Sequence, residues 1–367
     1  MDSAEEQDEI TILTQLTPIL NPQSPHVPAM PCKVTVLVAV YNTARFLPRC
    51  LDSLLAQTMK DIQVVCIDDA STDDSLQLLH SYARRDKRIE VIALPENHGQ
   101  AYARNRGLER ACGHYVCFLD SDDWLSADAL ERAAEVLDAN PATDCVLFQV
   151  DLIKQDAVKR YPMPPFSVLT GEEAFRLSLD WQIHGVYMVR AALHRRFPYD
   201  DTCRSYSDDN TTRLHYLHSR EVRQCQGIYN YYQHPSSTSN GISVRQFDKL
   251  RASESMKKAL VEAGVPDDVL RQWETTRMLV LADCYMFYHI YARRLSADER
   301  HHGLAEMRRA WQNIDTTLLN PQKTDKFGYR HMHSWTLFRL QEWAYFTLRG
   351  LIGKNRKIGI KVRKSIK

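Results

Sequence analysis

A cluster of acidic residues follows an apolar run in this sequence, and it could bind a cation. The run ends in Asp120-Ser121-Asp122-Asp123. Asp120 and Asp122 lie two residues apart and can face the same side of an extended chain. Three carboxylates this close repel one another unless something cationic lies between them. Carboxylate oxygens suit Mg²⁺ or Mn²⁺, and such an ion can join the protein to a phosphate group. The alternative is an acidic turn that caps the next helix.

Two other polar segments have side chains that could bind a nucleotide. A carboxylate of Asp68 or Asp69 could accept a hydrogen bond from a base N–H or a ribose hydroxyl, although this turn can also cap a helix. Gly99, two residues after Asn97, permits close approach of the backbone to a ligand. Arg104 could face phosphates or pair with a nearby Asp. The sequence has no Walker A motif and no GxGxxG after a strand, so metal and carboxylates would have to bind the phosphates.

The segments before these polar residues have the pattern of buried strands. A continuous apolar run rich in β-branched residues covers 34–40, and mainly apolar segments that also read as strands cover 64–67, 89–93, 115–119 and 145–150. Apolar residues at helical spacing cover 46–55, 76–82, 99–111 and 127–139. This alternation predicts an α/β fold with a mainly parallel sheet flanked by helices. Ligands bind beyond the carboxyl ends of such strands, so the polar segments should meet at one edge.

Composition divides the rest of the chain. We expect an extended or disordered, proline-rich lead-in over 1–31, a catalytic domain over 32–240 with halves 32–150 and 151–240, a helical region over 241–352, and a basic tail over 353–367. The whole chain has 47 basic and 46 acidic residues, which gives no reason to expect nucleic acid as a partner. Nine cysteines without a CxxC pair, an acidic N-terminus and no apolar run of about 18–20 residues predict a cytoplasmic protein with reduced thiols.

Residues 34–140 closely resemble glycosyltransferase family 2, whose fold is GT-A. The resemblance rests on the order and spacing of five motifs: Val38-Ala39-Val40-Tyr41-Asn42, Ser53-Leu54-Leu55-Ala56-Gln57-Thr58, Ile67-Asp68-Asp69-Ala70-Ser71-Thr72-Asp73, Asn97-His98-Gly99 through Ala103-Arg104-Asn105-Arg106-Gly107, and Phe118-Leu119-Asp120-Ser121-Asp122-Asp123. It implies inverting transfer of a sugar from a nucleotide-sugar, by default a UDP-sugar, to a hydroxyl of a glycan or lipid-linked acceptor. It also implies Mg²⁺ or Mn²⁺ as the cofactor.

The resemblance assigns roles to individual positions. The predicted donor-binding residues are Val40, Tyr41, Asn42, Asp68, Asp69, Asn97, Gly99, Arg104, Asp120 and Ser121. The predicted metal ligands are Asp122 and Asp120, joined by His234, which could instead be a plain loop histidine. An arginine that the family often has before Gln233-His234-Pro235 is missing.

Inverting transfer also needs a base for the acceptor hydroxyl. In the family this base is an acid that precedes a helix, and Asp208-Asp209 fits that position best. We favour Asp209 over Asp208, and a helix cap is the alternative. Two other functions stay open. A sugar-1-phosphate nucleotidyltransferase would need a basic, glycine-rich loop after the first strand, which Tyr41-Asn42-Thr43-Ala44 is not. The second is a catalytically inactive module that binds nucleotide-sugars or acts as a scaffold, and the intact acids argue against it.

The C-terminal segment has the composition of an interfacial helix. From Trp335 to Ile352 apolar residues recur at helical spacing, and seven basic residues with no acid follow Gly353. This combination predicts contact with an anionic membrane surface. The family resemblance implies the inner face of the membrane, because many relatives act on lipid-linked acceptors there. The alternative is a helix that packs on the catalytic domain and has a solvated basic end.

Overall fold

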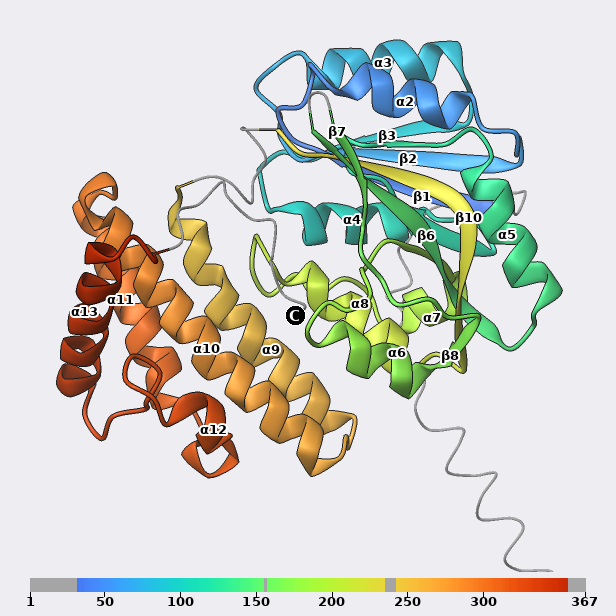
Figure 1. The fold of residues 1–367 in the computed structure, drawn as a ribbon. Helices are drawn as coiled ribbons and strands as arrows, with labels where there is room; N and C mark the ends of the chain where they lie inside the picture. The colour runs from blue at the N-terminus through green and yellow to red at the C-terminus, as the bar shows by residue number, and fades with distance from the viewer. Residues whose placement is uncertain (1–31, 155–156, 235–241, 356–367) are drawn as a thin grey trace, which may run out of the picture.

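The computed structural model describes residues 32–154, 157–234 and 242–355. A ten-stranded sheet with helices on both faces forms one side of the molecule, and a group of helices forms the other (Figure 1). The predicted α/β class and the helical C-terminal region are therefore confirmed. The predicted lead-in over 1–31 lies outside the described residues, as does most of the basic tail.

The first half of the sheet follows the sequence pattern closely. Its elements are β1 (Val34–Val40), α2 (Leu47–Leu55), β2 (Ile62–Asp68), α3 (Ser75–Arg85), β3 (Ile89–Ala93), α4 (Gln100–Leu108) and β4 (Tyr115–Phe118). The four strands pair in parallel in the order β3-β2-β1-β4. Val36 and Val38 of β1 contribute to the core under α2 and α3, whereas Leu37 contributes to the core under α4. This burial on two faces explains the continuous apolar runs.

The second half of the sheet is mixed. Its elements are β5 (Trp124–Leu125), α5 (Ala129–Ala139), β6 (Thr143–Lys154), β7 (Ala157–Arg160), β8 (Val168–Thr170), α6 (Gly171–Ser178), β9 (Tyr187–Arg190), α7 (Ala191–Arg196), α8 (Asp208–Leu217) and β10 (Glu221–Tyr232). β9 lies between β4 and β6 and is antiparallel to both, so β4 and β6 share one direction. β10 is parallel to β6. The main direction of the sheet is therefore parallel, as predicted, with short antiparallel strands added.

The helical region packs against the sheet domain. It contains α9 (Asp248–Glu262), α10 (Asp267–Tyr291), α11 (Ala297–Gln312), α12 (Pro321–Thr324) and α13 (Trp335–Leu351). Met256 of α9 and Trp273 of α10 belong to the same buried cluster as Phe175 of α6. The predicted boundary near residue 241 is thus crossed by a shared core, and the domain limits stay predictions. None of the described helices is long and apolar enough to span a bilayer.

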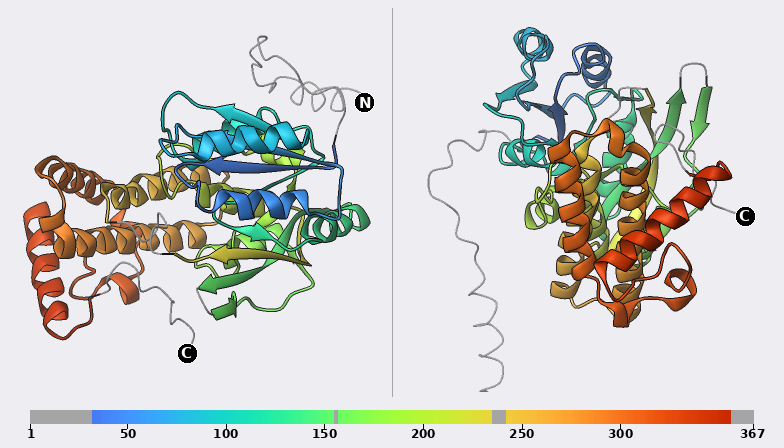
Figure 2. Two further views of the ribbon diagram at one scale, coloured as in Figure 1. Left: turned by 90° about the horizontal axis from the view of Figure 1, so that it is seen from above. Right: turned by 90° about the vertical axis from the view of Figure 1, so that its left-hand side faces the viewer.

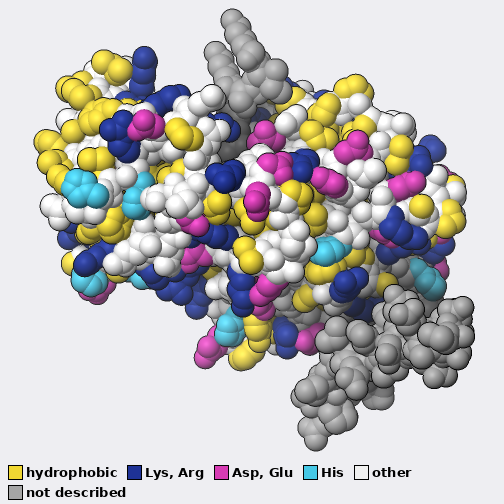
Figure 3. All heavy atoms as spheres, turned by 90° about the horizontal axis from the view of Figure 1, so that it is seen from below, with side chains coloured by type: hydrophobic (Ala, Val, Ile, Leu, Met, Phe, Trp, Pro, Cys, Tyr) yellow, Lys and Arg dark blue, Asp and Glu magenta, His cyan; other side chains and the backbone are white. Residues whose placement is uncertain are grey.

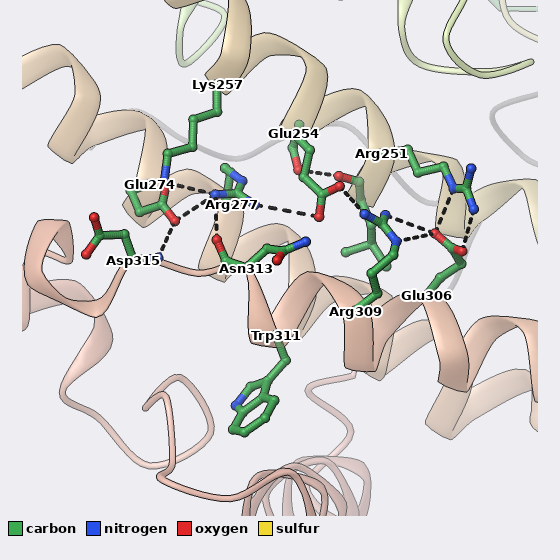
Figure 4. Close-up of polar contacts among 12 residues, drawn as sticks. Arg251, Glu254, Lys257, Glu274, Arg277, Glu306, Arg309, Trp311, Asn313 and Asp315 are labelled. Atoms are coloured by element: carbon green, nitrogen blue, oxygen red, sulfur yellow. Dashed lines mark hydrogen bonds and ion pairs between the residues drawn. The ribbon is translucent and has the colours of Figure 1, made fainter. Parts of the chain in front are cut away.

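Ion pairs join the long helices of this region (Figure 4). Glu274 of α10 is fully buried and accepts from Arg277 at 2.7 Å and from Lys257 of α9 at 2.7 Å. Arg251 of α9 contacts Glu306 of α11 at 2.7 Å. The buried carboxylates of Glu274 and Glu306 therefore each have a cation beside them, which offsets the cost of removing their charge from water.

Candidate active site

The loops that follow β1 and β2 are joined by hydrogen bonds at the carboxyl edge of the sheet. The carbonyl of Val40 accepts from the backbone N–H of Asp69 at 2.8 Å. The side-chain oxygen of Asn42 accepts from the backbone N–H of Thr72 at 2.7 Å. Asn42 has a φ of 53°, a left-handed conformation that asparagine tolerates better than most residues. Val40 and Asn42, both predicted to bind the donor, thus help to shape the edge.

The β4 loop joins the same edge. The hydroxyl of Thr43, in the loop after β1, contacts the hydroxyl of Ser121 at 3.0 Å. Ser121 is buried, whereas Tyr41 is 40% exposed. In the loop after β1, the ring of Tyr41 is therefore open to a ligand.

Asp68 and Asp69 are adjacent but have different surroundings. Both are buried. The carboxylate of Asp69 accepts from the side chain of Asn97 at 3.0 Å and from the backbone N–H groups of His98 and Gly99 at 2.9 and 2.8 Å. In Asp68, one carboxylate oxygen accepts from Ser71 N–H at 3.0 Å, and the other has no partner among the described residues. Asp69 therefore positions the 97–99 loop, while Asp68 keeps an acceptor for a ligand.

Gly99 is required by the backbone. Its φ is 98°, and a Cβ atom there would lie 2.6 Å from the carbonyl oxygen of Arg204. Any side chain would therefore push the 97–99 loop away from the 204 segment. Gly99 is the N-cap of α4, so this contact also sets where that helix starts.

Arg104 connects the two acidic segments that the sequence singled out. Its guanidinium, 2% exposed, donates to Asp120 at 2.5 Å and lies 3.6 Å from Asp208. Gln100, one helical turn earlier, also donates to Asp120 at 2.6 Å. Burial raises the pKa of Asp120 to about 6, although Arg104 acts in the opposite direction. The alternative in which Arg104 pairs with an Asp is therefore the one observed.

Asp122 contacts His234 instead. The Nε2 atom of His234 lies 2.8 Å from a carboxylate oxygen of Asp122, and the imidazole is 8% exposed. The ring of Phe46 lies 4.4 Å from the imidazole, centroid to centroid. Arg49 donates to the carbonyl of Asp122 at 2.9 Å. β10 places His234 here because its end runs alongside β5, two residues beyond Asp122.

Asp123 has a structural role in this cluster. It is 1% exposed and accepts from the backbone N–H of Tyr232 at 2.7 Å. Burial, with the charges of Asp120 and Asp122, raises its pKa well above the usual value. Asp123 therefore holds the end of β10 against the acidic loop.

The three predicted metal ligands do not form one group. Asp120 turns to Arg104, and Asp122 pairs with His234. Within 32–154, 157–234 and 242–355, no three His, Cys, Asp or Glu side chains form a metal-binding group. Mg²⁺ usually takes one or two protein ligands and completes its coordination with phosphate oxygens and water. The Asp122–His234 pair fits that limited contribution.

The predicted base lies at the start of α8. Asp208 and Asp209 occupy the first turn of this helix, where the helix dipole stabilises negative charge. The carboxylate of Asp208 lies 3.6 Å from the guanidinium of Arg104. Asp208 and Asp209 are both partly exposed. The structure thus brings the base candidates to the same edge as Asp120.

Several residues of this edge were not predicted. Arg49 lies over the rings of Trp124 and Tyr232 at 3.7 and 4.5 Å. Gln100 reaches Asp120, and the hydroxyl of Tyr229 accepts from the backbone N–H of Asp120 at 3.0 Å. The i, i+4 spacing of Gln100 and Arg104 could have identified Gln100. No sequence pattern connects Arg49 or Tyr229 with the acidic loop.

Comparison with known proteins identifies the class. Residues 35–201 match Glycosyl transferase family 2. A protein described as uncharacterized glycosyltransferase EpsJ, from Bacillus subtilis (strain 168), is 30% identical over 56% of this chain and 62% of its own length. Glycosyltransferase GlyA from Streptococcus pneumoniae is 46% identical over 27% of this chain and 14% of its own length. The domain over residues 35–201 is therefore a glycosyltransferase family 2 domain.

Solved structures agree on the fold. S. aureus TarS 1-349 in complex with UDP-GlcNAc is 19% identical, with a TM-score of 0.66 over 88% of this chain and 92% of that one. This likeness confirms the GT-A fold. The chain spans less than two thirds of the length of the curated relatives described above.

Proposed function

We propose that the protein is a metal-dependent, inverting glycosyltransferase. It would move a sugar from a nucleotide-sugar, by preference a UDP-sugar, to a hydroxyl of a glycan or lipid-linked acceptor. The observation that carries this proposal is the position of Arg104 between Asp120 and Asp208, because it places the predicted donor side and the predicted base side together. The UDP-GlcNAc complex of TarS supports the choice of donor.

Names of relatives support a polymer acceptor. One protein with 40% identity over 27% of this chain is described as poly(ribitol-phosphate) beta-glucosyltransferase, and another is described as a putative teichuronic acid biosynthesis glycosyltransferase. These names favour a polymer as the acceptor, and a lipid-linked saccharide stays part of the proposal on the family resemblance alone. A lipid-linked acceptor would bring the protein to the cytoplasmic face of a membrane.

Each residue of the site has a proposed part in the transfer. The free oxygen of Asp68 accepts a hydrogen bond from the nucleoside, and the ring of Tyr41 contacts the base. Asp209 takes the proton of the acceptor hydroxyl while the hydroxyl oxygen of the acceptor forms a bond to the anomeric carbon. The bond from that carbon to the nucleoside diphosphate breaks on the opposite side, which inverts the configuration.

Asp122 and His234 would hold Mg²⁺ or Mn²⁺ in this proposal. Their contact at 2.8 Å supports this assignment, because one cation could touch both side chains after a small adjustment. When bound, such an ion neutralises the negative charge that develops on the leaving diphosphate. Arg104 keeps Asp120 turned toward α4 during the transfer.

A binding and turnover experiment tests the proposal. A panel of nucleotide-sugars is added with Mn²⁺ or Mg²⁺ while thermal unfolding is followed, since a ligand of the folded state raises the unfolding temperature. We expect a UDP-sugar to raise it only with metal, and to release UDP when an acceptor is present. Binding without release, from any acceptor or from water, would favour the inactive module. No binding by any member of the panel would contradict both.

A further inference from the structure

Helix α13 packs on the molecule through one face only. Phe338, Glu342 and Phe346 are buried, and the two phenylalanines belong to the core of the helical region. The ring of Tyr285 in α10 meets that of Phe338 at a centroid distance of 6.2 Å. In the right-hand view of Figure 2, α13 crosses this end of the molecule as its outermost helix.

The opposite face of α13 is apolar and open to solvent. Its large apolar side chains are more than half exposed: Leu340 58%, Trp343 55%, Leu348 57%, Leu351 80% and, directly after the helix, Ile352 63%. Arg339 lies at the edge of this face by helical spacing, while Glu342 and Arg349 turn toward the bundle. A helix that faces only water normally exposes charged and polar residues. An apolar face of this kind therefore marks a contact surface. We call it the outward face.

Basic side chains line a hollow beside α13. The hollow, about 380 Å³, lies between α10, α12 and α13 and is lined by Lys323, Lys326 and Arg349 together with the acidic Asp283. Arg349 is held in place because its guanidinium donates to the hydroxyl of Tyr329 at 3.2 Å. Figure 3 shows yellow apolar groups and dark blue basic groups mixed at this end of the molecule.

More positive charge follows the helix in the sequence. Seven basic residues and no acid come after Gly353, and the first of them, Lys354, accepts a hydrogen bond on its carbonyl from Arg349 at 2.9 Å. Cations thus lie next to α13 at two places, the hollow and the start of the tail. A neutral protein partner would not call for this charge, whereas an anionic lipid surface would.

We propose that the outward face of α13 docks on an anionic lipid bilayer. Leu340, Trp343, Leu348 and Leu351 enter the boundary between headgroups and acyl chains, and Lys323 and Lys326 contact anionic headgroups. The proposal refines the predicted interfacial helix: Phe338 and Phe346 serve the core and do not take part in docking. It does not depend on the transferase proposal, because docking needs neither donor nor acceptor.

Vesicle sedimentation of the full chain tests the docking. Phosphatidylcholine vesicles with and without phosphatidylglycerol are compared at low and high salt, in the absence of nucleotide-sugar. We expect binding to the anionic vesicles at low salt and its loss at high salt. The triple variant Leu340→Gln/Trp343→Gln/Leu351→Gln should lower the bound fraction at least about tenfold. Lys323→Gln/Lys326→Gln should lower it by about tenfold.

Two matched controls separate docking from general stickiness. Val261→Gln removes a side chain of α9 that is 56% exposed, and Lys258→Gln removes an exposed charge of the same helix. Neither control should change binding. Thermal unfolding of each variant confirms that it is folded.

Three results would overturn the proposal. The full chain does not bind anionic vesicles at low salt, or the triple variant binds as well as the parent, or Val261→Gln has the same effect as the triple variant. Sedimentation equilibrium of the same proteins identifies the other occupant: if the triple variant loses self-association while vesicle binding is unchanged, a second copy of the chain covers the outward face.

Discussion

The guanidinium of Arg104 donates to the carboxylate of Asp120 at 2.5 Å while it lies over the ring of Phe118 at 4.0 Å. The ring and the carboxylate hold the cation in one orientation, and its other end points to Asp208 at 3.6 Å. The guanidinium is 2% exposed, whereas the carboxylates of Asp120 and Asp208 are 26% and 31% exposed, so the buried cation lies between two partly exposed carboxylates. The position of the Asp120 carboxylate is therefore set by α4 as well as by β4.

Replacing Arg104 with lysine should damage turnover while it keeps the charge. A lysine ammonium is a single point of charge, so it cannot contact Asp120 and Asp208 together as the planar guanidinium does. We expect kcat to fall about tenfold or more. Arg106→Lys is the control, since Arg106 is on the same helix and pairs with Glu109 at the surface. Steady-state kinetics with the donor identified by the panel measure both, and equal activity of the two variants would contradict the role of Arg104.

The two base candidates should differ in how they affect kinetics. Asp209→Asn should lower kcat by about a hundredfold or more with little change in donor affinity, because a base acts in the chemical step. Asp208→Asn removes the second partner of Arg104, so it should alter donor affinity as well. Donor binding by calorimetry and turnover of both variants decide the assignment. If Asp208→Asn shows the pure kcat effect, the base is Asp208.

Asp122 and His234 should control metal dependence together. Asp122→Asn keeps the size of the side chain and removes its charge, so metal affinity and nucleotide-sugar affinity should fall in parallel. His234→Gln should weaken metal binding less. Asp128→Asn is the control, because Asp128 pairs with Arg132 at the surface. Calorimetric titration with Mn²⁺ plus UDP measures these affinities in each variant. Full activity of the parent in excess EDTA would refute the metal proposal.

The parallel half of the sheet can be predicted from the sequence because its strands have a clear apolar pattern. β1 and β2 are buried on both faces, so their residues are almost all apolar. Sequence reasoning missed β10, where Arg223, Gln224 and Gln226 interrupt the apolar pattern because that strand is only partly covered. It missed β9 because four residues are too few for a periodicity.

The site was predictable where residues act through the local chain. Asp68 is the last residue of β2, and Asp120 and Asp122 follow β4, so the rule for parallel sheets places them at one edge. The sequence allows Arg104 either to face phosphates or to pair with a nearby Asp, and only three-dimensional packing decides between these two. The contacts of Asp69 with His98 and Gly99 use backbone N–H groups, which carry no signature in a sequence.

Breaking the buried ion pair of the helical region should destabilise the fold. Glu274→Gln leaves Arg277, 3% exposed, with only the more distant Glu254 at 3.7 Å as a charged partner, and the expected loss is about 3–5 kcal/mol. Glu262→Gln is the control, because Glu262 lies 3.8 Å from Lys258 at the surface and should matter by less than about 1 kcal/mol. Urea unfolding measures both. Equal midpoints for the two variants would show that the pair contributes nothing.

Glu342 should make stability depend on pH in the direction opposite to most acids. It is fully buried on the inner side of α13, and burial raises the pKa of its carboxyl to about 8. Only the side chain of Gln341, donating at 3.2 Å, acts against this. The unfolded chain loses this proton near the ordinary value of about 4.5, whereas the folded protein keeps it until about pH 8. Unfolding therefore releases a proton in that window, and the Glu342 contribution to stability falls as pH rises through it.

Glu342→Gln removes this titration and keeps the shape of the side chain. The variant should match the parent near pH 4 and be more stable at pH 7, by about 3 kcal/mol, because each pKa unit corresponds to about 1.4 kcal/mol. Urea unfolding of both proteins from pH 4 to pH 8 gives the difference as a function of pH. The Glu262→Gln variant controls for the loss of a carboxyl group as such. A difference between Glu342→Gln and the parent that does not grow with pH would show that the Glu342 carboxyl is ionised in the folded protein, and α13 would then have to pack around a buried charge.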